Sequence, residues 1–242
     1  MYLRLYWNEE ANCANRPEEN IRLNPFTDPE IVAGYETWYQ TAGRPADQQE
    51  KALLKWLLNG FPEAQSILEV GCGTGHFTRW FSELGIQAAG LDLSRPMLEE
   101  AKGLGGPVYL QGDALMLPFL SKSIDLVALI TTLEFLSDPG RALAEAMRVA
   151  RQGLVLGVLN AQSRLGRRYK REGGPVWESA RFFTPDELER MILEVVGGGA
   201  GVVWRTTLWP LWPGALSLPW GGFIGMMVKF FDVYVEEIRI QE

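Results

Sequence analysis

Cysteine and histidine are scarce in this sequence. Its 242 residues include two cysteines and one histidine. Cys13 and Cys72 match neither a disulfide framework nor a metal-ligand spacing, and one histidine cannot complete such a spacing. The sequence therefore predicts no metal site and a reducing compartment, the cytoplasm. In agreement with this, Met1 to Arg22 lack the basic, apolar and small-residue series of a signal peptide.

Positive charge is also in deficit. Lys and Arg number 23 against 30 Asp and Glu, so the net charge is −7. Because nucleic acids are polyanions, this balance argues against DNA or RNA as the main partner. We expect a small-molecule partner and a chain that acts as a monomer or a homodimer.

One long uncharged run raises the question of a membrane span. No charged residue occurs between Thr206 and Val228, a length that could cross a bilayer. Three prolines and four glycines interrupt the run, however, and would break a spanning helix. We therefore expect no membrane span, but a buried or pocket-lining loop followed by a strand.

What the sequence does contain is a regular alternation of strand and helix patterns. Apolar runs predict five strands, at Ile67–Val70, Ile86–Leu93, Val108–Gln111, Ile124–Ile130 and Leu154–Leu159. Apolar periodicity and cap residues predict helices at His76–Leu84, from Ser94 through Ala101, at Pro139–Ala150 and from Thr184 onward. Two final strands are expected at Val202–Thr207 and Phe223–Val228.

This alternation predicts an α/β fold. We expect a Rossmann-like open sheet, mostly parallel and seven-stranded, with helices on both faces and an antiparallel last strand. The chain length and its 47% apolar content suit a single domain. Within residues 1–242 we expect a helical cap over 1–62, a ligand-binding core over 63–160, and a lid with the final strands over 161–242.

The loop after the first predicted strand is the most specific feature of the chain. The strand contains Glu69, and Gly71, Gly73 and Gly75 follow at alternate positions. Glycines allow positive φ and let a ligand approach the main chain closely, so the loop predicts a nucleotide-like ligand. A dinucleotide fingerprint would need a further glycine where His76 stands, which makes a nicotinamide-dependent reductase the weaker alternative.

Two acids stand at the ends of the next strands. Asp92 ends the second strand, where a carboxylate can accept hydrogen bonds from both hydroxyls of a ribose. Asp113, followed by Ala114, ends the third strand and could accept a hydrogen bond from an adenine amino group. Because ligands bind beyond the carboxyl ends of such strands, we expect these acids and the glycine loop to share one cleft.

A series of motifs occurs in a characteristic order. It comprises E-x-G-x-G-x-G from Glu69, Leu91-Asp92-Leu93-Ser94 with Met97-Leu98, Gly112-Asp113-Ala114 before Leu117-Pro118-Phe119, Ile124-Asp125-Leu126-Val127, and Phe182-Phe183-Thr184-Pro185-Asp186-Glu187-Leu188. Over roughly Tyr35 to Leu193 the chain thereby resembles class I S-adenosylmethionine-dependent methyltransferases, of the methyltransferase type 11 group known from ubiquinone and menaquinone biosynthesis. The resemblance implies an EC 2.1.1 enzyme that methylates a small molecule and releases S-adenosylhomocysteine.

The same resemblance implies roles for individual residues. Gly71 and Gly73 would border the methionine part of the cofactor, Glu69 would organise the loop and the methionine amino group, Asp92 would hold the ribose, and Asp113 the adenine. The full set of expected cofactor residues is Glu69, Gly71, Cys72, Gly73, Gly75, Asp92, Leu93, Met97, Asp113, Ala114 and Thr131.

Two departures from the family pattern bear on catalysis. Glu134-Phe135 stands where the family commonly has Glu-His, and Arg151-Gln152-Gly153 replaces a Pro-Gly turn. Methyl transfer needs a general base only when the acceptor holds its proton at neutral pH. The candidates for that base are Glu134, His76 and Tyr39, and none has a motif that singles it out. A methyltransferase-like binding or regulatory domain without transfer activity is therefore the main alternative.

Aromatic residues suggest where an acceptor could bind. Tyr35, Trp38 and Tyr39 share one helical face, and Trp209 and Trp212 belong to a late segment rich in tryptophan. We take Tyr35, Trp38, Trp209 and Trp212 as candidates for contact with an aromatic or apolar acceptor. Ordinary core packing explains the same residues about as well. Arginines from Arg164 to Arg171 could hold an anionic acceptor or form a solvated face.

Overall fold

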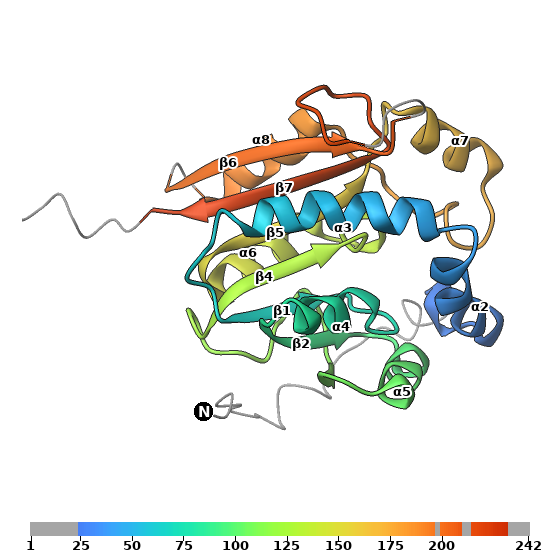
Figure 1. Cartoon of the computed structure of the whole chain (residues 1–242), viewed down its shortest axis with the longest axis horizontal. Helices are drawn as coiled ribbons and strands as arrows, with labels where there is room; N and C mark the ends of the chain where they lie inside the picture. The colour runs from blue at the N-terminus through green and yellow to red at the C-terminus, as the bar shows by residue number, and fades with distance from the viewer. Residues whose placement is uncertain (1–23, 197–198, 210–213, 232–242) are drawn as a thin grey trace, which may run out of the picture.

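A computed structural model describes residues 24–196, 199–209 and 214–231. The core is a seven-stranded sheet in the order β3-β2-β1-β4-β5-β7-β6 (Figure 1). Its strands are β1 (Ser66–Val70), β2 (Gln87–Asp92), β3 (Val108–Gln111), β4 (Ile124–Ile130), β5 (Ala150–Leu159), β6 (Ala200–Thr207) and β7 (Phe223–Phe230). All neighbouring pairs from β3 to β5 are parallel, whereas β7 is antiparallel to β5 and β6. The predicted fold class is confirmed.

Alternating residues of the central strands face two separate helical layers. Leu68 of β1 and Val127 of β4 belong to a core with α6 (Pro139–Val149) and α8 (Pro185–Val196). Ile67 and Leu126 belong to the core on the other face, with α3 (Arg44–Leu58) and α4 (His76–Glu83). Every residue of β4 is buried, as expected for a central parallel strand covered on both faces.

The remaining helices gather around the ends of the sheet. α5 (Arg95–Leu104) packs against β2 and β3, and α2 (Pro29–Gln40), with the short helix η2 (Pro25–Thr27) before it, lies at the end toward which the β4 arrow points (Figure 1). α7 (Arg164–Glu172) follows β5, and the short helix η3 (Leu133–Phe135) follows β4. Side-chain caps begin several of these helices, from Asp28, Ser94, Asp138 and Ser163.

β5 differs most from its sequence-based prediction. It begins at Ala150, which pairs with Ile124, and not at Leu154. The register shifts between Ile124 and Leu126, so the chain accommodates exposed Arg151 within the strand. The first residues of β5 include polar side chains, so a search for apolar runs does not detect the start of the strand.

The uncharged run from Thr206 to Val228 spans the end of β6, a connection and most of β7. Residues 206–209 and 214–228 of this run are described and form no helix. Across the described part of the chain, no helix is both long and apolar enough to cross a membrane.

Candidate functional site

A pocket of about 450 Å³ opens where β1, β2, β3 and β4 end. Its volume falls in the range of small-molecule sites. Eight of the eleven predicted cofactor residues line it: Gly71, Gly73, Asp92, Leu93, Met97, Asp113, Ala114 and Thr131. The parallel topology brings these segments together, because the carboxyl ends of adjacent parallel strands meet at one edge of the sheet.

The glycine loop has the backbone conformation that only glycine adopts easily. The φ angles of Gly71, Gly73 and Gly75 are 74°, 53° and 79°. A Cβ placed on Gly71 would lie 2.3 Å from Thr132 Cγ2, so this position also has no room for a side chain. A Cβ on Gly73 would lie 3.7 Å from the Tyr35 ring and meet nothing closer. The backbone of Gly73 is therefore accessible from the pocket, close to the Tyr35 ring.

Asp92 holds the loop and faces the same pocket. One carboxyl oxygen accepts a hydrogen bond from Gly73 N at 2.7 Å, and the other accepts one from Ser94 N at 2.8 Å. Burial raises the pKa of Asp92, and these backbone donors oppose the rise. On the next strand end, Asp113 accepts a hydrogen bond from Leu115 N at 2.9 Å. Each carboxyl group can accept further hydrogen bonds, and both residues line the pocket.

Three predicted cofactor residues lie behind the pocket wall. Glu69 is 2% exposed and accepts a short hydrogen bond from the Thr78 hydroxyl. Burial raises its pKa to about 8, although the Thr78 hydrogen bond opposes the rise. Cys72 is buried against Gly90, and Gly75 precedes the first turn of α4. These three residues support the conformation of the loop and do not line the pocket.

The segment after β4 supplies a strained residue and an unpaired oxygen. Thr131 has φ of 51°, an uncommon conformation for a β-branched residue, and it lines the pocket. Glu134, in η3, is 1% exposed and accepts a hydrogen bond from Leu159 N at 2.7 Å through Oε1. Its Oε2 is buried and has no hydrogen-bond partner among the described residues. Burial raises the pKa of Glu134 to about 8.

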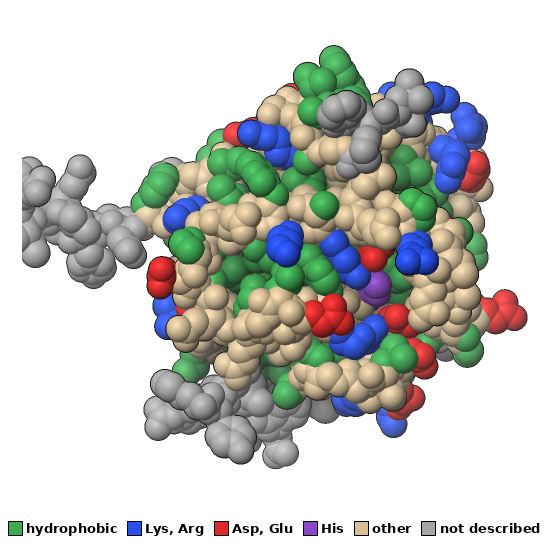
Figure 2. All heavy atoms as spheres, viewed as in Figure 1, with side chains coloured by type: hydrophobic (Ala, Val, Ile, Leu, Met, Phe, Trp, Pro, Cys, Tyr) green, Lys and Arg blue, Asp and Glu red, His purple; other side chains and the backbone are tan. Residues whose placement is uncertain are grey.

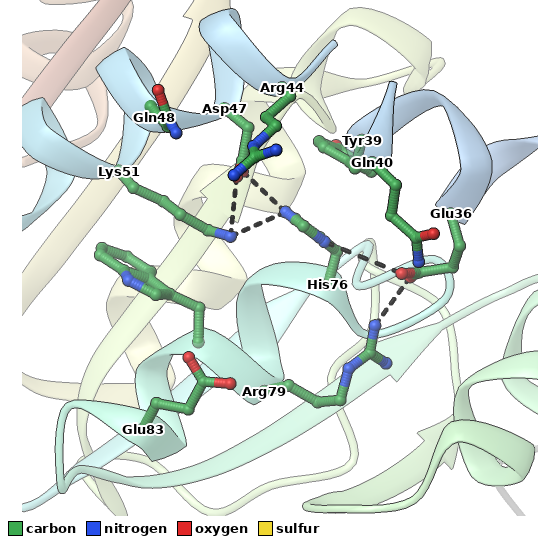
Figure 3. Close-up of a pocket in the computed structure, with 11 residues that line it drawn as sticks. Glu36, Tyr39, Gln40, Arg44, Asp47, Gln48, Lys51, His76, Arg79 and Glu83 are labelled. Atoms are coloured by element: carbon green, nitrogen blue, oxygen red, sulfur yellow. Dashed lines mark hydrogen bonds and ion pairs between the residues drawn. The ribbon is translucent and has the colours of Figure 1, made fainter. Parts of the chain in front are cut away.

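The other two base candidates lie outside this pocket. His76 and Tyr39 line a separate pocket of about 440 Å³ between α2, α3 and α4 (Figure 3). Their rings stack at 3.7 Å, and His76 Nε2 lies 2.7 Å from Asp47 Oδ1. His76 Nδ1 lies 3.9 Å from Glu36, which also pairs with Arg79 at 2.7 Å. These contacts link α2, α3 and α4. Neither His76 nor Tyr39 lines the pocket that contains Asp92.

The four predicted acceptor residues are not brought together. Tyr35 lines the pocket that contains Asp92. Trp38 is 41% exposed and covers Gly43. Trp209 lines a third pocket, beside α7, and Trp212 lies outside the described residues. Of the four, only Tyr35 therefore has a described position on the pocket of the glycine loop.

Several wall residues have no counterpart among the sequence predictions. They come from η2, from the segment after β4 and from the segment before α8, and they include Phe26, Phe135 and Arg181. Phe26 and Phe135 meet edge to face at 4.8 Å. The turn signals Asn24-Pro25 and Asp28-Pro29 indicate turns in this segment, but they do not indicate which part of the fold the segment packs against.

Comparisons with known proteins agree with this geometry. A family model described as a methyltransferase domain matches residues 68–156. An uncharacterised protein of Mycobacterium tuberculosis is 36% identical over 170 residues, 67% of this chain and 57% of that protein, so the chain spans little more than half of its length. The demethylmenaquinone methyltransferase of Renibacterium salmoninarum is 34% identical over 95 residues, 39% of this chain and 40% of that protein.

A solved structure matches over a longer range. It is an S-adenosylmethionine-dependent methyltransferase of Thermotoga maritima, described as a possible histamine N-methyltransferase. The two chains are 31% identical with a TM-score of 0.70, and the match covers 84% of this chain and 97% of the other. Fold, glycine loop and sequence identity agree, and they confirm the resemblance seen in the motifs. The chain therefore belongs to the S-adenosylmethionine-dependent methyltransferases.

Proposed function

We propose that this protein transfers a methyl group from S-adenosylmethionine to a small-molecule acceptor. The observation that carries the proposal is the convergence of the open Gly73 backbone, Asp92 and Asp113 on one pocket. This function accounts for each of the three groups, because the cofactor has an amino-acid part, a ribose and an adenine. A glycine loop with only a structural role would not need two acids in the same cavity.

The pocket walls fit the cofactor on structural grounds. We assign the amino-acid part to Gly71 and Gly73, the ribose hydroxyls to Asp92, and the adenine to Asp113 with Ala114. Burial raises the pKa values of Glu69 and Glu134, and a cationic ligand near these carboxyl groups would favour their charged forms. When bound, the cofactor supplies a methyl group that its sulfonium has already activated.

The residues of the chain then have to position an acceptor and exclude water. Tyr35, Phe26 and Phe135 form an aromatic wall on the pocket, which suits an aromatic or apolar acceptor. Glu134 Oε2, a buried oxygen of the pocket lining without a hydrogen-bond partner among the described residues, is available for an acceptor N–H or O–H. In its ionised form this oxygen would accept the acceptor proton, which assigns Glu134 rather than His76 or Tyr39 as the base. The remaining rate acceleration would come from holding acceptor and methyl group close together and from excluding water.

The domain organisation belongs to the same proposal. Residues 63–160 form the cofactor core, residues 1–62 contribute the helical cap with Tyr35, and residues 161–242 contribute the acceptor-side lid and the final strands. The name of the Thermotoga protein suggests an amine acceptor and that of the Renibacterium protein a quinone precursor. Both are small molecules, and the aromatic wall with one buried carboxyl group is compatible with either.

Replacing Asp92 tests the cofactor assignment. Calorimetric titration with S-adenosylmethionine, S-adenosylhomocysteine and NADH should give binding of the first two only. Asp92→Ala should weaken binding by about 1.5–3 kcal/mol, because a charged hydrogen-bond acceptor is lost. Asp186→Ala, which removes an exposed acid on α8, is the matched control and should leave the affinity unchanged. Binding of NADH alone, or an unchanged affinity of Asp92→Ala, would contradict the assignment.

Transfer itself needs a separate experiment. Incubation with methyl-labelled cofactor and a panel of amines, phenols and quinone precursors should label at least one compound class. Glu134→Gln should lower turnover while cofactor affinity stays within about threefold, if Glu134 acts on the acceptor. Cofactor binding without labelling of any class would favour the alternative, a binding or regulatory domain.

A further inference from the structure

The third pocket, separate from the cofactor pocket, is the cavity beside α7. Its volume is about 1070 Å³, and it is bounded by α7, by the two residues before α7 and by residues of the connection between β6 and β7. The described lining residues are Gln162, Ser163, Arg164, Leu165, Arg167, Arg168, Arg171, Leu208, Trp209 and Trp220. None of them lines the cofactor pocket.

One wall of this cavity is strongly basic. Arg164, Arg167, Arg168 and Arg171 follow one another at spacings that share a helical face. The described lining contains no acidic residue, and within the described chain neither Arg164 nor Arg171 forms an ion pair. Figure 2 shows Lys and Arg side chains gathered at the upper right, where Figure 1 places α7. The positive charge is therefore local, on a chain whose net charge is −7.

Another wall of the cavity is apolar, and hydrogen bonds hold it in place. It contains Leu208, Trp209 and Trp220, and Trp220 is 59% exposed. Trp209 Nε1 donates to Thr206 O at 3.1 Å, which fixes its indole ring. Asn160 Nδ2 donates to Pro219 O at 2.6 Å and Gly221 O at 2.8 Å, next to Trp220. The wall is thus organised before any ligand binds, which lowers the cost of binding.

α7 forms a partition between this cavity and the cofactor site. Tyr169 of α7 stacks on Trp177 at 4.6 Å with nearly parallel rings, and the Arg168 guanidinium lies 5.3 Å from the centre of the Tyr169 ring. Trp177 in turn contacts Phe135 at 6.1 Å, and Phe135 lines the cofactor pocket. The arginines line the cavity beside α7, and the aromatic contacts from Tyr169 through Trp177 to Phe135 lead to the cofactor pocket.

We propose that this cavity binds an anionic amphiphile, with a carboxylate or phosphate head on the α7 arginines and a hydrocarbon or aromatic body against Leu208, Trp209 and Trp220. Guanidinium groups pair with both kinds of head in a two-point geometry. Such a ligand would cover the exposed Trp220 and pair with Arg164 and Arg171, which form no ion pair within the described chain. A purely inorganic anion would leave the apolar wall unused, and a cation would meet the arginines unfavourably.

Decyl phosphate, kept below its micelle concentration, is a suitable probe. Calorimetric titration of the full chain should show saturable binding of decyl phosphate. Inorganic phosphate and the neutral decyl glucoside should each bind at least tenfold more weakly, because each offers only one half of the ligand. Equal binding of inorganic phosphate or of decyl glucoside would overturn the proposal. Binding to vesicles containing phosphatidylglycerol, without binding of monomeric decyl phosphate, would also overturn it, in favour of a membrane surface.

Two pairs of substitutions locate the site. Arg164→Gln with Arg171→Gln should weaken decyl phosphate binding at least tenfold. Lys170→Gln with Arg190→Gln removes the same charge from residues that do not line the cavity, and it should weaken binding less than twofold. Trp220→Ala should weaken decyl phosphate about fivefold and leave inorganic phosphate unaffected. Equal losses in the two double variants would show a general charge effect and refute the site. S-adenosylmethionine affinity should stay unchanged in all variants, which keeps this test independent of the proposed methyl transfer.

Discussion

At the scale of single residues, the buried carboxyl groups around the cofactor pocket are the most consequential feature. Glu69 and Glu134 are nearly inaccessible to water, and burial raises both pKa values to about 8. Each group makes a hydrogen bond that favours its charged form, but desolvation is larger. At neutral pH the ligand-free protein therefore holds protons at these positions, and a cationic ligand would favour their release.

Cofactor binding should accordingly release protons. At pH 7.5 both groups are mostly protonated before binding, and a nearby sulfonium or ammonium lowers their pKa values. We expect a net release of about one proton, read from calorimetric enthalpies in phosphate and Tris buffers, whose ionisation enthalpies differ. Glu134→Gln should reduce the release, whereas Glu83→Gln, on the exposed end of α4, should not. Equal enthalpies in both buffers would show that the carboxyl groups do not respond to the ligand.

At the scale of elements, the cluster around His76 connects three helices. His76 begins α4 directly after the glycine loop, Glu36 belongs to α2 and Asp47 to α3 (Figure 3). Burial and the nearby Lys51 lower the pKa of His76, but its hydrogen bond to Asp47 and its pairing with Glu36 outweigh them and raise the pKa. The same contacts, with Thr74 and Arg79, lower the pKa of Glu36 to about 2 despite its burial. The charged imidazolium is therefore the form that holds the helices together.

The contribution of His76 to stability should depend on pH with a definite sign. A histidine whose pKa is raised by folding stabilises most below its unfolded value, about 6.5, and loses this contribution as pH rises through its folded value. His76→Gln should lower the free energy of unfolding by about 1–2 kcal/mol at pH 6 and by less at pH 9, measured by urea denaturation. Arg95→Gln, which breaks an exposed pair with Glu99, should change it by less than about 0.5 kcal/mol at either pH. A pH-independent loss in His76→Gln would point to ring packing on Tyr39 instead.

At the scale of the whole molecule, α3 packs an early part of the chain against the last two strands, β6 and β7. Leu53, Leu54 and Leu57 of this helix are buried against the sheet. The approach is close, because a Cβ on Gly225 of β7 would lie 2.8 Å from Leu53 Cδ2. Residues far apart in the sequence thus share one hydrophobic core, as the single-domain proposal requires.

A core substitution in α3 should therefore weaken the entire molecule. Leu54→Ala should lower the free energy of unfolding by about 2–5 kcal/mol, because the 0% exposed side chain leaves a cavity. The neighbouring Lys55→Ala is exposed and should change it by less than about 0.5 kcal/mol. Unfolding of Leu54→Ala should remain a single transition by both fluorescence and circular dichroism. Two separate transitions would show that α3 belongs to an independent cap.

Much of the fold follows from local sequence patterns. The strands Val108–Gln111 and Ile124–Ile130 begin and end where their apolar runs predict. β5 was misplaced at its start because Arg151 lies at a bulge, where pairing with β4 outweighs local polarity. The convergence of Gly71, Asp92 and Asp113 could also be predicted, since the topology of a parallel sheet places its strand ends together.

The sequence by itself determined the α/β architecture, the glycine loop and the two acids that follow it, because each depends on local periodicity or on a backbone conformation that glycine allows. Only the tertiary structure decided which side chains share a cavity. It placed Tyr35 and Trp209 in different pockets and His76 in a cluster that links three helices. It also left Glu134 with a buried oxygen that has no hydrogen-bond partner among the described residues. Such outcomes depend on packing between segments distant in the chain, and the pattern within one segment does not carry that information.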